Sequence, residues 1–151
     1  MKVSILYGTE SGNAELVADD VAESLEDSNV TIEDLQDADV LALSTDTLYL
    51  IICSTHGEGN LPESAQPFAE ALEAEKPDLQ GIRFAMFGLG DSTYEHYSRG
   101  SEHIDHRLRA LGATRVGEYG RHDASSRSSA SEVAVAWAAG VLANSYETTP
   151  A

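Results

Sequence analysis

Three short runs of almost continuous apolar residues restrict the fold of this chain more than any other feature. They cover residues 2–7, 48–54 and 83–88. A strand with apolar side chains at successive positions needs cover on both faces, as the strands of a parallel sheet have. Helical patterns separate the runs, so we expect strands and helices to alternate. The sequence therefore predicts an α/β fold with a doubly wound parallel sheet and helices on both faces.

Two weaker strands, at residues 30–35 and 115–119, complete a predicted five-stranded sheet. A short helix is expected at residues 38–43. Apolar stripes at helical spacing predict four longer helices. The side chains that these stripes should bury are Ala14, Val17, Ala18, Val21 and Leu25 in the first helix, Ala65, Phe68, Ala69 and Leu72 in the second, Ile104, Leu108 and Leu111 in the third, and Val133, Ala136, Trp137 and Val141 in the last.

The polar residues of the third helix are expected on its outer side. These residues are Glu102, Asp105, Arg107 and Arg109. His103 and His106 fall mainly on the same side, so a solvated face explains them better than a metal site does. Cys53 is the only cysteine, which excludes intrachain disulfides and CxxC-type metal sites. Because it ends an apolar run, we expect an inert buried thiol.

The length of the chain fits one domain. We expect this domain to cover residues 1–145 and to be followed by a flexible tail at residues 146–151, with the last helix fraying from residue 144. No apolar run is long enough for a secretory signal or a membrane span. We therefore expect a cytoplasmic protein, and a monomer.

The acidic charge of the chain is unevenly distributed. The formal net charge is −17, and residues 1–79 contain 18 of the 26 acidic residues but only 2 of the 9 lysines and arginines. Such a surface repels nucleic acid and anionic membranes and attracts basic partners. Adaptation to a salty, halophilic cytoplasm is an equally good explanation of the charge.

The three strongest predicted strands each lead into an unusual loop, at residues 8–13, 54–62 and 88–98. In a doubly wound sheet these loops share the carboxyl edge, where such sheets bind ligands. The first loop offers hydroxyls and the N–H groups of a helix start to a phosphate, without the lysine of a triphosphate-binding loop. The others contribute glycine-rich backbone and the rings of His56, Tyr94 and Tyr97. This combination indicates a mononucleotide with a large planar ring, which points to FMN.

The segments YGTESGNAE, STHGEGNLP and GLGDSTYEHY resemble the three flavin loops of the flavodoxin family. The chain is most similar to short-chain flavodoxins of the MioC type and to the FMN domains of diflavin reductases, such as sulfite and cytochrome P450 reductases. The resemblance implies FMN and the strand order 2-1-3-4-5. It assigns FMN binding to Thr9, Glu10, Ser11, Gly12, Asn13 and Ala14 at the phosphate, to Ser54, Thr55, His56, Gly57 and Glu58 on one side of the ring, to Leu89, Gly90, Asp91, Tyr94, Tyr97 and Ser98 on the other, and to Asp123 near the ribityl chain.

Two of these positions depart from the pattern of many flavodoxins. Ala14 stands where many members have threonine, which removes one phosphate donor, and His56 stands where many have tryptophan or tyrosine against the ring. Imidazole stacks over a smaller area and gains charge near pH ~6.5. Gly57 fits the family pattern, because glycine lets the peptide before Glu58 turn toward ring atom N5 at little steric cost.

The resemblance implies an electron carrier rather than an enzyme, with no catalytic or metal-binding residue. FMN would take single electrons from a basic flavoprotein reductase of the ferredoxin or flavodoxin NADP reductase type and pass them to a redox acceptor enzyme. Two alternatives are a flavodoxin-like NAD(P)H quinone reductase and an excised FMN domain of a diflavin reductase. A flavin-free receiver module is disfavoured, because residues 53–55 place no aspartate after the third strand.

Overall fold

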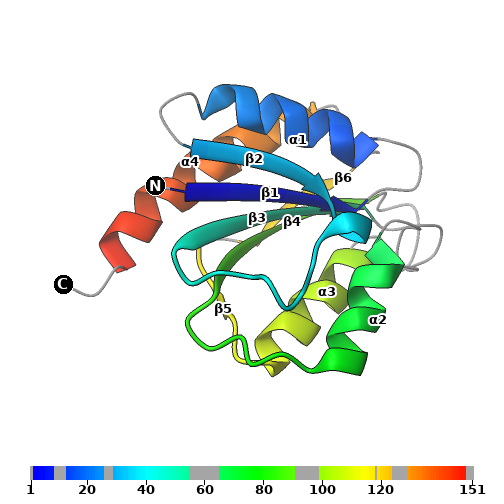
Figure 1. The fold of residues 1–151 in the computed structure, drawn as a ribbon. Helices are drawn as coiled ribbons and strands as arrows, with labels where there is room; N and C mark the ends of the chain where they lie inside the picture. The colour runs from blue at the N-terminus through cyan, green and yellow to red at the C-terminus, as the bar shows by residue number, and fades with distance from the viewer. Residues whose placement is uncertain are drawn as a thin grey trace.

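The computed structural model describes residues 2–8, 13–25, 29–54, 65–90, 99–117, 119–123 and 129–148 (Figure 1). Its strands are β1 (Lys2–Gly8), β2 (Asn29–Asp34), β3 (Thr47–Ser54), β4 (Arg83–Gly90), β5 (Thr114–Arg115) and β6 (Gly120–Asp123). Its helices are α1 (Asn13–Ser24), α2 (Gln66–Glu75), α3 (Arg99–Ala110) and α4 (Ala130–Thr148), and a 3-10 turn covers Leu35–Asp37.

Every strand pair in the described part of the chain is parallel, and the strand order is β2-β1-β3-β4-β5. β1 lies between β2 and β3, so that Val3 pairs with Val30 on one side and with Leu48 on the other. The predicted parallel sheet and its strand order are confirmed. The start of β1 and the end of α4 lie at the opposite end of the sheet from the carboxyl ends of the strands (Figure 1).

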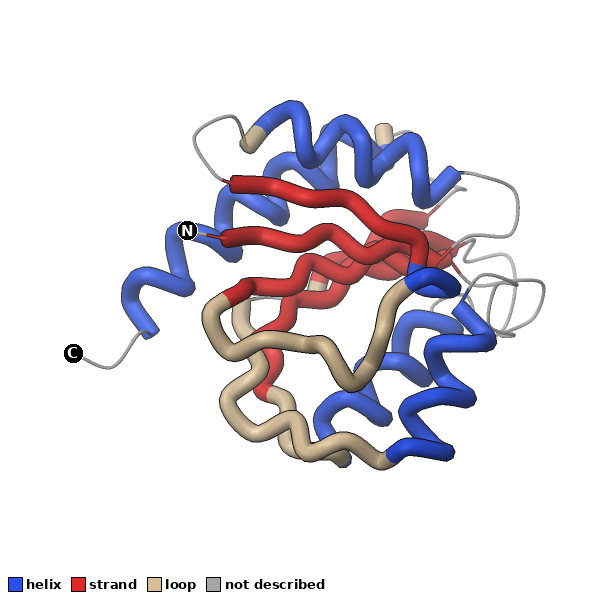
Figure 2. The backbone as a smooth tube through the Cα atoms, in the orientation of Figure 1, coloured by secondary structure: helices blue, strands red, loops and turns tan. Residues whose placement is uncertain are grey.

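The central strands are apolar at successive positions because they supply two cores. Ile5 and Leu50 point into a core with α1 and α4, whereas Leu6 and Ile51 point into a core with α2 and α3. Figure 2 shows the sheet between these two helical layers. The predicted apolar stripe of the first helix is confirmed, since the five residues assigned to the stripe are all buried. Each layer thus buries one face of the same strands.

The fifth predicted strand is wrong in its bounds. Two short strands, β5 and β6, both pair with β4, and residues 116–117 lie outside either strand. Gly117 has φ +72, and a Cβ atom there would lie 2.8 Å from Cγ2 of Val141. Because the backbone turns this close to α4, the position needs glycine. Asp123, which the resemblance places near the ribityl chain, is the last residue of β6 and pairs with Gly90 of β4.

The short helix predicted at residues 38–43 is also wrong. The 3-10 turn before it ends at Asp37, and the next residue, Ala38, is extended with ψ 136°. The connection to β3 is held by side chains instead. The Asp39 carboxylate accepts a hydrogen bond from the N–H of Leu41 at 2.9 Å, and the Tyr49 hydroxyl accepts one from the N–H of Ser44 at 2.7 Å. Such local bonds compete with helix formation.

Three further expectations about the helices need correction. Asp105 is buried, with 3% exposure, although we expected it to face solvent. Ala136 is exposed, and Ala134 and Ala138 take its place in the core. α4 continues to Thr148, beyond the fraying expected at residue 144. Trp137 is buried as predicted.

Candidate functional site

The carboxyl ends of the central strands lie side by side. Gly8 at the end of β1 pairs with Cys53, and Cys53 pairs with Gly88 of β4. One residue further, Ser54 pairs with Leu89. β6 ends beside β4, where Gly90 pairs with Asp123. The segments that follow these strands therefore start from one edge of the sheet.

The chain leaves this edge in two directions. After β1 it enters α1, which packs on one face, and after β3 it enters α2, which packs on the other. β1 and β3 are neighbours, so this is the point at which the order of the sheet reverses. Open α/β sheets bind ligands in the crevice that this reversal creates. The first N–H groups of α1 are directed to the same edge and favour an anion.

The structure describes part of the predicted site. Ala14 and Leu89 are buried, with 0% and 7% exposure, so they support the edge from below. The backbone of Asn13, Ser54, Gly90 and Asp123 is placed at the ends of its strands or helix. The remaining predicted residues lie outside the described part of the chain, namely Thr9, Glu10, Ser11, Gly12, Thr55, His56, Gly57, Glu58, Asp91, Tyr94, Tyr97 and Ser98.

Beneath the edge, the end of β1 is tightly packed. A Cβ atom on Gly8 would lie 2.9 Å from Cδ1 of Leu35, 3.0 Å from Cβ of Ala65 and 3.2 Å from Sγ of Cys53. A larger residue would push apart the strand, α2 and the 3-10 turn. Burial of Cys53 raises the pKa of its thiol to about 12, which fits the predicted inert thiol.

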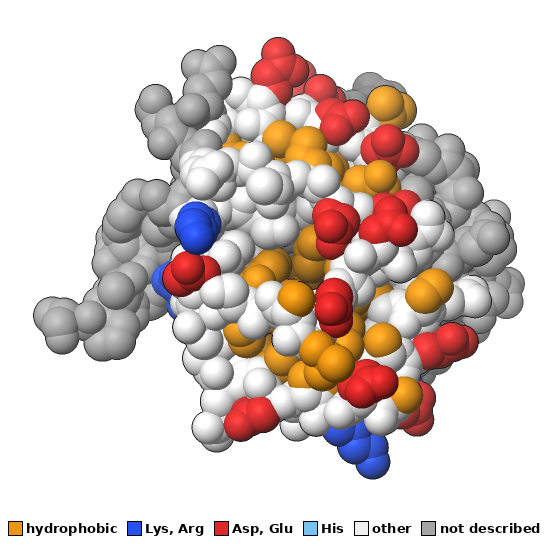
Figure 3. Space-filling view, viewed as in Figure 1, with side chains coloured by type: hydrophobic (Ala, Val, Ile, Leu, Met, Phe, Trp, Pro, Cys, Tyr) orange, Lys and Arg blue, Asp and Glu red, His pale blue; other side chains and the backbone are white. Residues whose placement is uncertain are grey.

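Acidic side chains surround the end of β1. Burial raises the pKa of the Tyr7 phenol, and the charges of Glu15 and Asp34 raise it further. Glu15 is in the first turn of α1, and Asp34 ends β2. Acidic side chains also outnumber basic ones on the face drawn in Figure 3. A phosphate at this edge would need hydrogen-bond donors to offset these charges, and the start of α1 supplies them.

A cluster that sequence reasoning missed joins α3 to the last strands. Arg121 of β6 forms an ion pair with Glu102 in the first turn of α3, at 3.3 Å. Two guanidinium groups lie over the Tyr119 ring, with Cζ of Arg121 4.0 Å and Cζ of Arg115 5.1 Å from the ring centroid. α3 directly follows residues 91–98, so these contacts fix the point from which that predicted flavin loop departs.

Asp105 anchors the same helix from its buried side. Its carboxylate accepts hydrogen bonds from Nη1 of Arg115 at 3.1 and 3.0 Å and lies 3.0 Å from Nη2 of Arg109. A buried charge needs such partners. Helical periodicity could not reveal this role, because Arg115 lies in the next strand.

The start of α1 at this edge suits the phosphate of FMN. In the described part of the chain no three metal-ligating side chains come together, and His103 and His106 are exposed on α3. An anionic mononucleotide suits a helix start at a topological switch point, where backbone N–H groups hold the phosphate without a cation.

Among the described helices, none has the length and apolar character needed to span a membrane.

Comparisons with known proteins agree with this geometry. The family model for flavodoxin matches residues 5–137. Protein MioC of Escherichia coli O157:H7 is 36% identical over 116 residues, which are 77% of this chain and 79% of MioC. The flavoprotein alpha-component of the NADPH sulfite reductase of Bacillus subtilis is 38% identical over 118 residues, but the match spans only 20% of that longer protein.

Solved structures give the same result. The C101S mutant of flavodoxin from Pseudomonas aeruginosa superimposes with a TM-score of 0.81 and 31% identity, over 95% of this chain and 98% of that one. Oxidised flavodoxin 1 from Bacillus cereus gives a TM-score of 0.77 at 25% identity. With the sheet order and the switch point described above, these matches show that the chain belongs to the flavodoxin family of electron-transfer proteins, whose cofactor is FMN.

Proposed function

We propose that this protein carries single electrons from an NADPH-dependent flavoprotein reductase to a redox acceptor enzyme. The observation that carries the proposal is the single carboxyl edge at which β1, β3, β4 and β6 end, next to the start of α1. Bound there, FMN supplies the one-electron chemistry. The chain's own residues bind it, orient it and set the charge around it.

We further propose that the three predicted loops hold FMN with the residues named above. The hydroxyl and amide side chains at residues 9–13 would bind its phosphate, beside the N–H groups of α1. His56, Tyr94 and Tyr97 would cover the planar ring. Support for this assignment comes from the described strand ends, because each loop begins directly after one of them.

The surroundings of this edge favour a basic reductase. Glu15, Asp19 and Asp34 all raise the pKa of Tyr7, so their negative charges act together at the end of β1. Complementary charge speeds the encounter of two proteins, and salt screens the effect. We therefore expect reduction by a basic reductase to slow as ionic strength rises.

An anaerobic redox titration followed by the visible spectrum tests the cofactor and the one-electron steps. We expect one FMN per chain and two separate reduction steps. Purified protein that takes up no FMN when supplied in excess would contradict the proposal. Consumption of NADPH with a quinone and no reductase would contradict the role as a carrier.

Stopped-flow reduction tests the docking charge with two matched variants on one helix. Glu15 and Glu23 are both exposed on α1, but Glu15 lies in the first turn, near the carboxyl edge, and Glu23 in the last. At low salt we expect Glu15→Gln to slow reduction about twofold or more, and Glu23→Gln to have a smaller effect. Equal effects, or rates independent of salt, would contradict docking at this edge.

A second candidate is an FMN domain of a larger diflavin reductase. The 38% identity to the sulfite reductase flavoprotein component of Bacillus subtilis favours it. A domain of this kind receives electrons from a reductase module on the same chain. Efficient reduction of the separate protein by an added reductase, with a rate proportional to the reductase concentration, would favour the free carrier.

A further inference from the structure

The short strand β6 contacts the chain at both ends of the predicted flavin loop at residues 91–98. The loop starts after Gly90, the last residue of β4, which pairs with Asp123 of β6. It leads into α3, where Glu102 in the first turn forms an ion pair with Arg121 of β6 at 3.3 Å. The backbone of β6 therefore places the entry of the loop, and one of its side chains places the exit.

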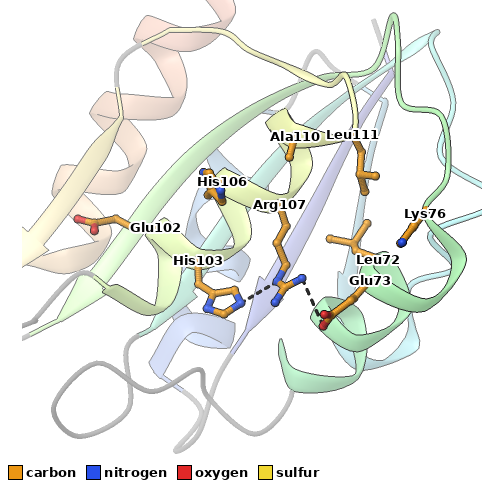
Figure 4. A pocket seen from close by; sticks show the side chains of 9 residues that line it. All are labelled: Leu72, Glu73, Lys76, Glu102, His103, His106, Arg107, Ala110 and Leu111. Atoms are coloured by element: carbon orange, nitrogen blue, oxygen red, sulfur yellow. Dashed lines mark hydrogen bonds and ion pairs between the residues drawn. The ribbon is translucent and has the colours of Figure 1, made fainter.

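The Arg121 side chain is held on the α3 side of the sheet. Successive residues of a strand point to opposite faces, and the neighbouring Gly120 faces α4, where a Cβ atom would lie 2.7 Å from Cδ1 of Trp137. Because a larger residue does not fit there, β6 cannot exchange its two faces. Figure 4 shows Glu102 on the opposite side of α3 from Arg107, so its carboxylate is turned away from α2.

The Tyr119 ring restricts the position of the Arg121 guanidinium. Cζ of Arg121 lies 4.0 Å from the ring centroid, and the ring packs against the core between the sheet and the layer of α2 and α3. From this position Nη2 of Arg121 donates a hydrogen bond to Oε1 of Glu102. A planar guanidinium can stack on a ring and donate from its edge at the same time, whereas a lysine ammonium lacks this geometry. The contact is thus specific to arginine and has a fixed direction.

The contact is too exposed to act mainly through stability. The side chains of Arg121 and Glu102 are 38% and 48% exposed, and ion pairs of this kind contribute little to the free energy of unfolding. Lys2 and Asp46 form a comparable exposed pair at 3.4 Å, next to the amino ends of β1 and β3. Of these two pairs, only that of Arg121 adjoins a predicted flavin loop, so its effect should appear in flavin binding.

We propose that Arg121 is a positioning residue for the flavin ring. Through Glu102 it fixes the point at which residues 91–98 join α3, and these residues cover one side of the ring in the proposed function, on which this inference rests. Arg121 acts on the ring side and not on the phosphate, because β3 and β4 lie between β6 and β1, the strand that leads into the phosphate loop. It needs no contact with FMN itself.

Two flavins that share the ring and differ in the phosphate test the proposal. FMN and riboflavin are titrated into the chain freed of its flavin, and the quenching of flavin fluorescence measures each dissociation constant. We expect Arg121→Gln to weaken the binding of both by the same factor, about threefold or more. Attraction between Arg121 and the phosphate would weaken FMN binding alone. The visible circular dichroism of bound FMN reports the surroundings of the ring and should change as well.

Matched variants separate positioning from charge and from loss of fold. Lys2→Gln removes the same charge from the comparable pair at the other end of the sheet and should change neither dissociation constant. Glu102→Gln should match Arg121→Gln, and the double variant should lose no more than either single one, because both act through one contact. Arg121→Lys keeps the charge without the planar group and should give an intermediate loss. Equal urea midpoints of the flavin-free proteins would exclude loss of fold as the cause.

Three results would overturn this inference and leave the proposed function intact. The first is unchanged riboflavin affinity in Arg121→Gln, or a natural protein that binds FMN but no riboflavin, since the ring side then contributes no affinity to adjust. The second is an equal loss in Lys2→Gln, which would mean a general effect of charge. The third is an additive loss in the double variant. Failure of the natural protein to bind FMN at all would instead contradict the proposed function itself.

Discussion

The two helical layers close the same sheet in different ways. The layer of α1 and α4 is apolar at its contact with the sheet, where the Trp137 ring packs on Phe87 with centroids 5.2 Å apart. The layer of α2 and α3 also buries a large apolar core, but it contains a buried carboxylate, Asp105, and leaves a groove between its helices. The first layer is closed against the sheet by hydrophobic packing, with an exposed hydrogen bond from Ser131 to Asp20 between its two helices. The second layer combines packing with a buried, charged hydrogen-bond contact to the sheet.

This difference separates two tasks. Apolar packing has no direction, so the first layer can supply stability through close fit alone. Hydrogen-bonded charges have directions, so the second layer can fix α3 relative to β5 and β6 and can present charge in a groove. We expect substitutions in the first layer to lower the free energy of unfolding more than substitutions of the polar contacts in the second.

The largest effect is expected in the first layer, at Trp137. Trp137→Ala removes a buried ring that contacts Phe87 and should lower the free energy of unfolding by about 3–5 kcal/mol. Urea unfolding measures the loss. Trp137→Phe keeps an aromatic ring at this position, so its free energy of unfolding should fall clearly less than that of Trp137→Ala. A loss below that of the Asp105 variant described next would contradict the comparison.

A smaller loss is expected in the second layer, at Asp105. Asp105→Ala leaves Arg115 and Arg109 without their shared carboxylate, and their side chains, 30% and 50% exposed, can turn to water. We therefore expect the free energy of unfolding to fall by about 1–3 kcal/mol, which is less than the loss expected when a fully buried ion pair is broken. Asp19→Ala, at an exposed position of helix α1, serves as the control in urea unfolding. If both variants unfold at the same urea concentration, the anchoring role of Asp105 is wrong.

Replacing Lys76 by glycine is expected to raise the free energy of unfolding or to leave it unchanged. Lys76→Gly relieves the positive φ, while the added freedom of glycine in the unfolded chain offsets part of the benefit. The variant should be up to about 1 kcal/mol more stable than Lys76→Ala, which keeps the strain. Thermal unfolding of the pair measures this difference. Greater stability of the alanine variant would show that the backbone here is relaxed.

The smallest effect concerns pH. Partial burial of the His103 ring, together with the charge of Arg107, lowers the pKa of His103 from its usual 6.5. Below pH 6.5 the unfolded chain then binds more protons than the folded one, so His103 contributes stability above this pH that is lost as the pH falls. Urea midpoints between pH 7 and pH 5 should fall more in the natural protein than in His103→Gln. If the urea midpoints of the two proteins fall in parallel over this pH range, His103 does not contribute to the pH dependence of stability.

The sequence predicted those features that depend on local pattern. Continuous apolar runs at residues 48–54 and 83–88 indicated central parallel strands, and the stripe of α1 indicated its buried face. The phase of α4 was harder to predict. This helix has small apolar residues on all of its sides, so periodicity could not distinguish the exposed Ala136 from the buried Ala134 and Ala138.

Other features depend on partners far along the chain. The burial of Asp105 needs Arg115, and the division of the fifth strand needs the close approach of Gly117 to Val141. The groove exists because α2 and α3, separated by a strand, meet side by side. For the site, the sequence located the shared edge through strand ends, but most of the residues assigned to FMN stay a prediction.

The position of the described chain ends has a practical consequence. The start of β1 and the end of α4 lie on the side of the sheet opposite to its carboxyl edge (Figure 1). A linker attached at either end would emerge on the far side of the molecule from the proposed flavin. The protein could thus be immobilised on an electrode through a terminal tag with its redox edge turned toward solution, ready to exchange current with a dissolved mediator.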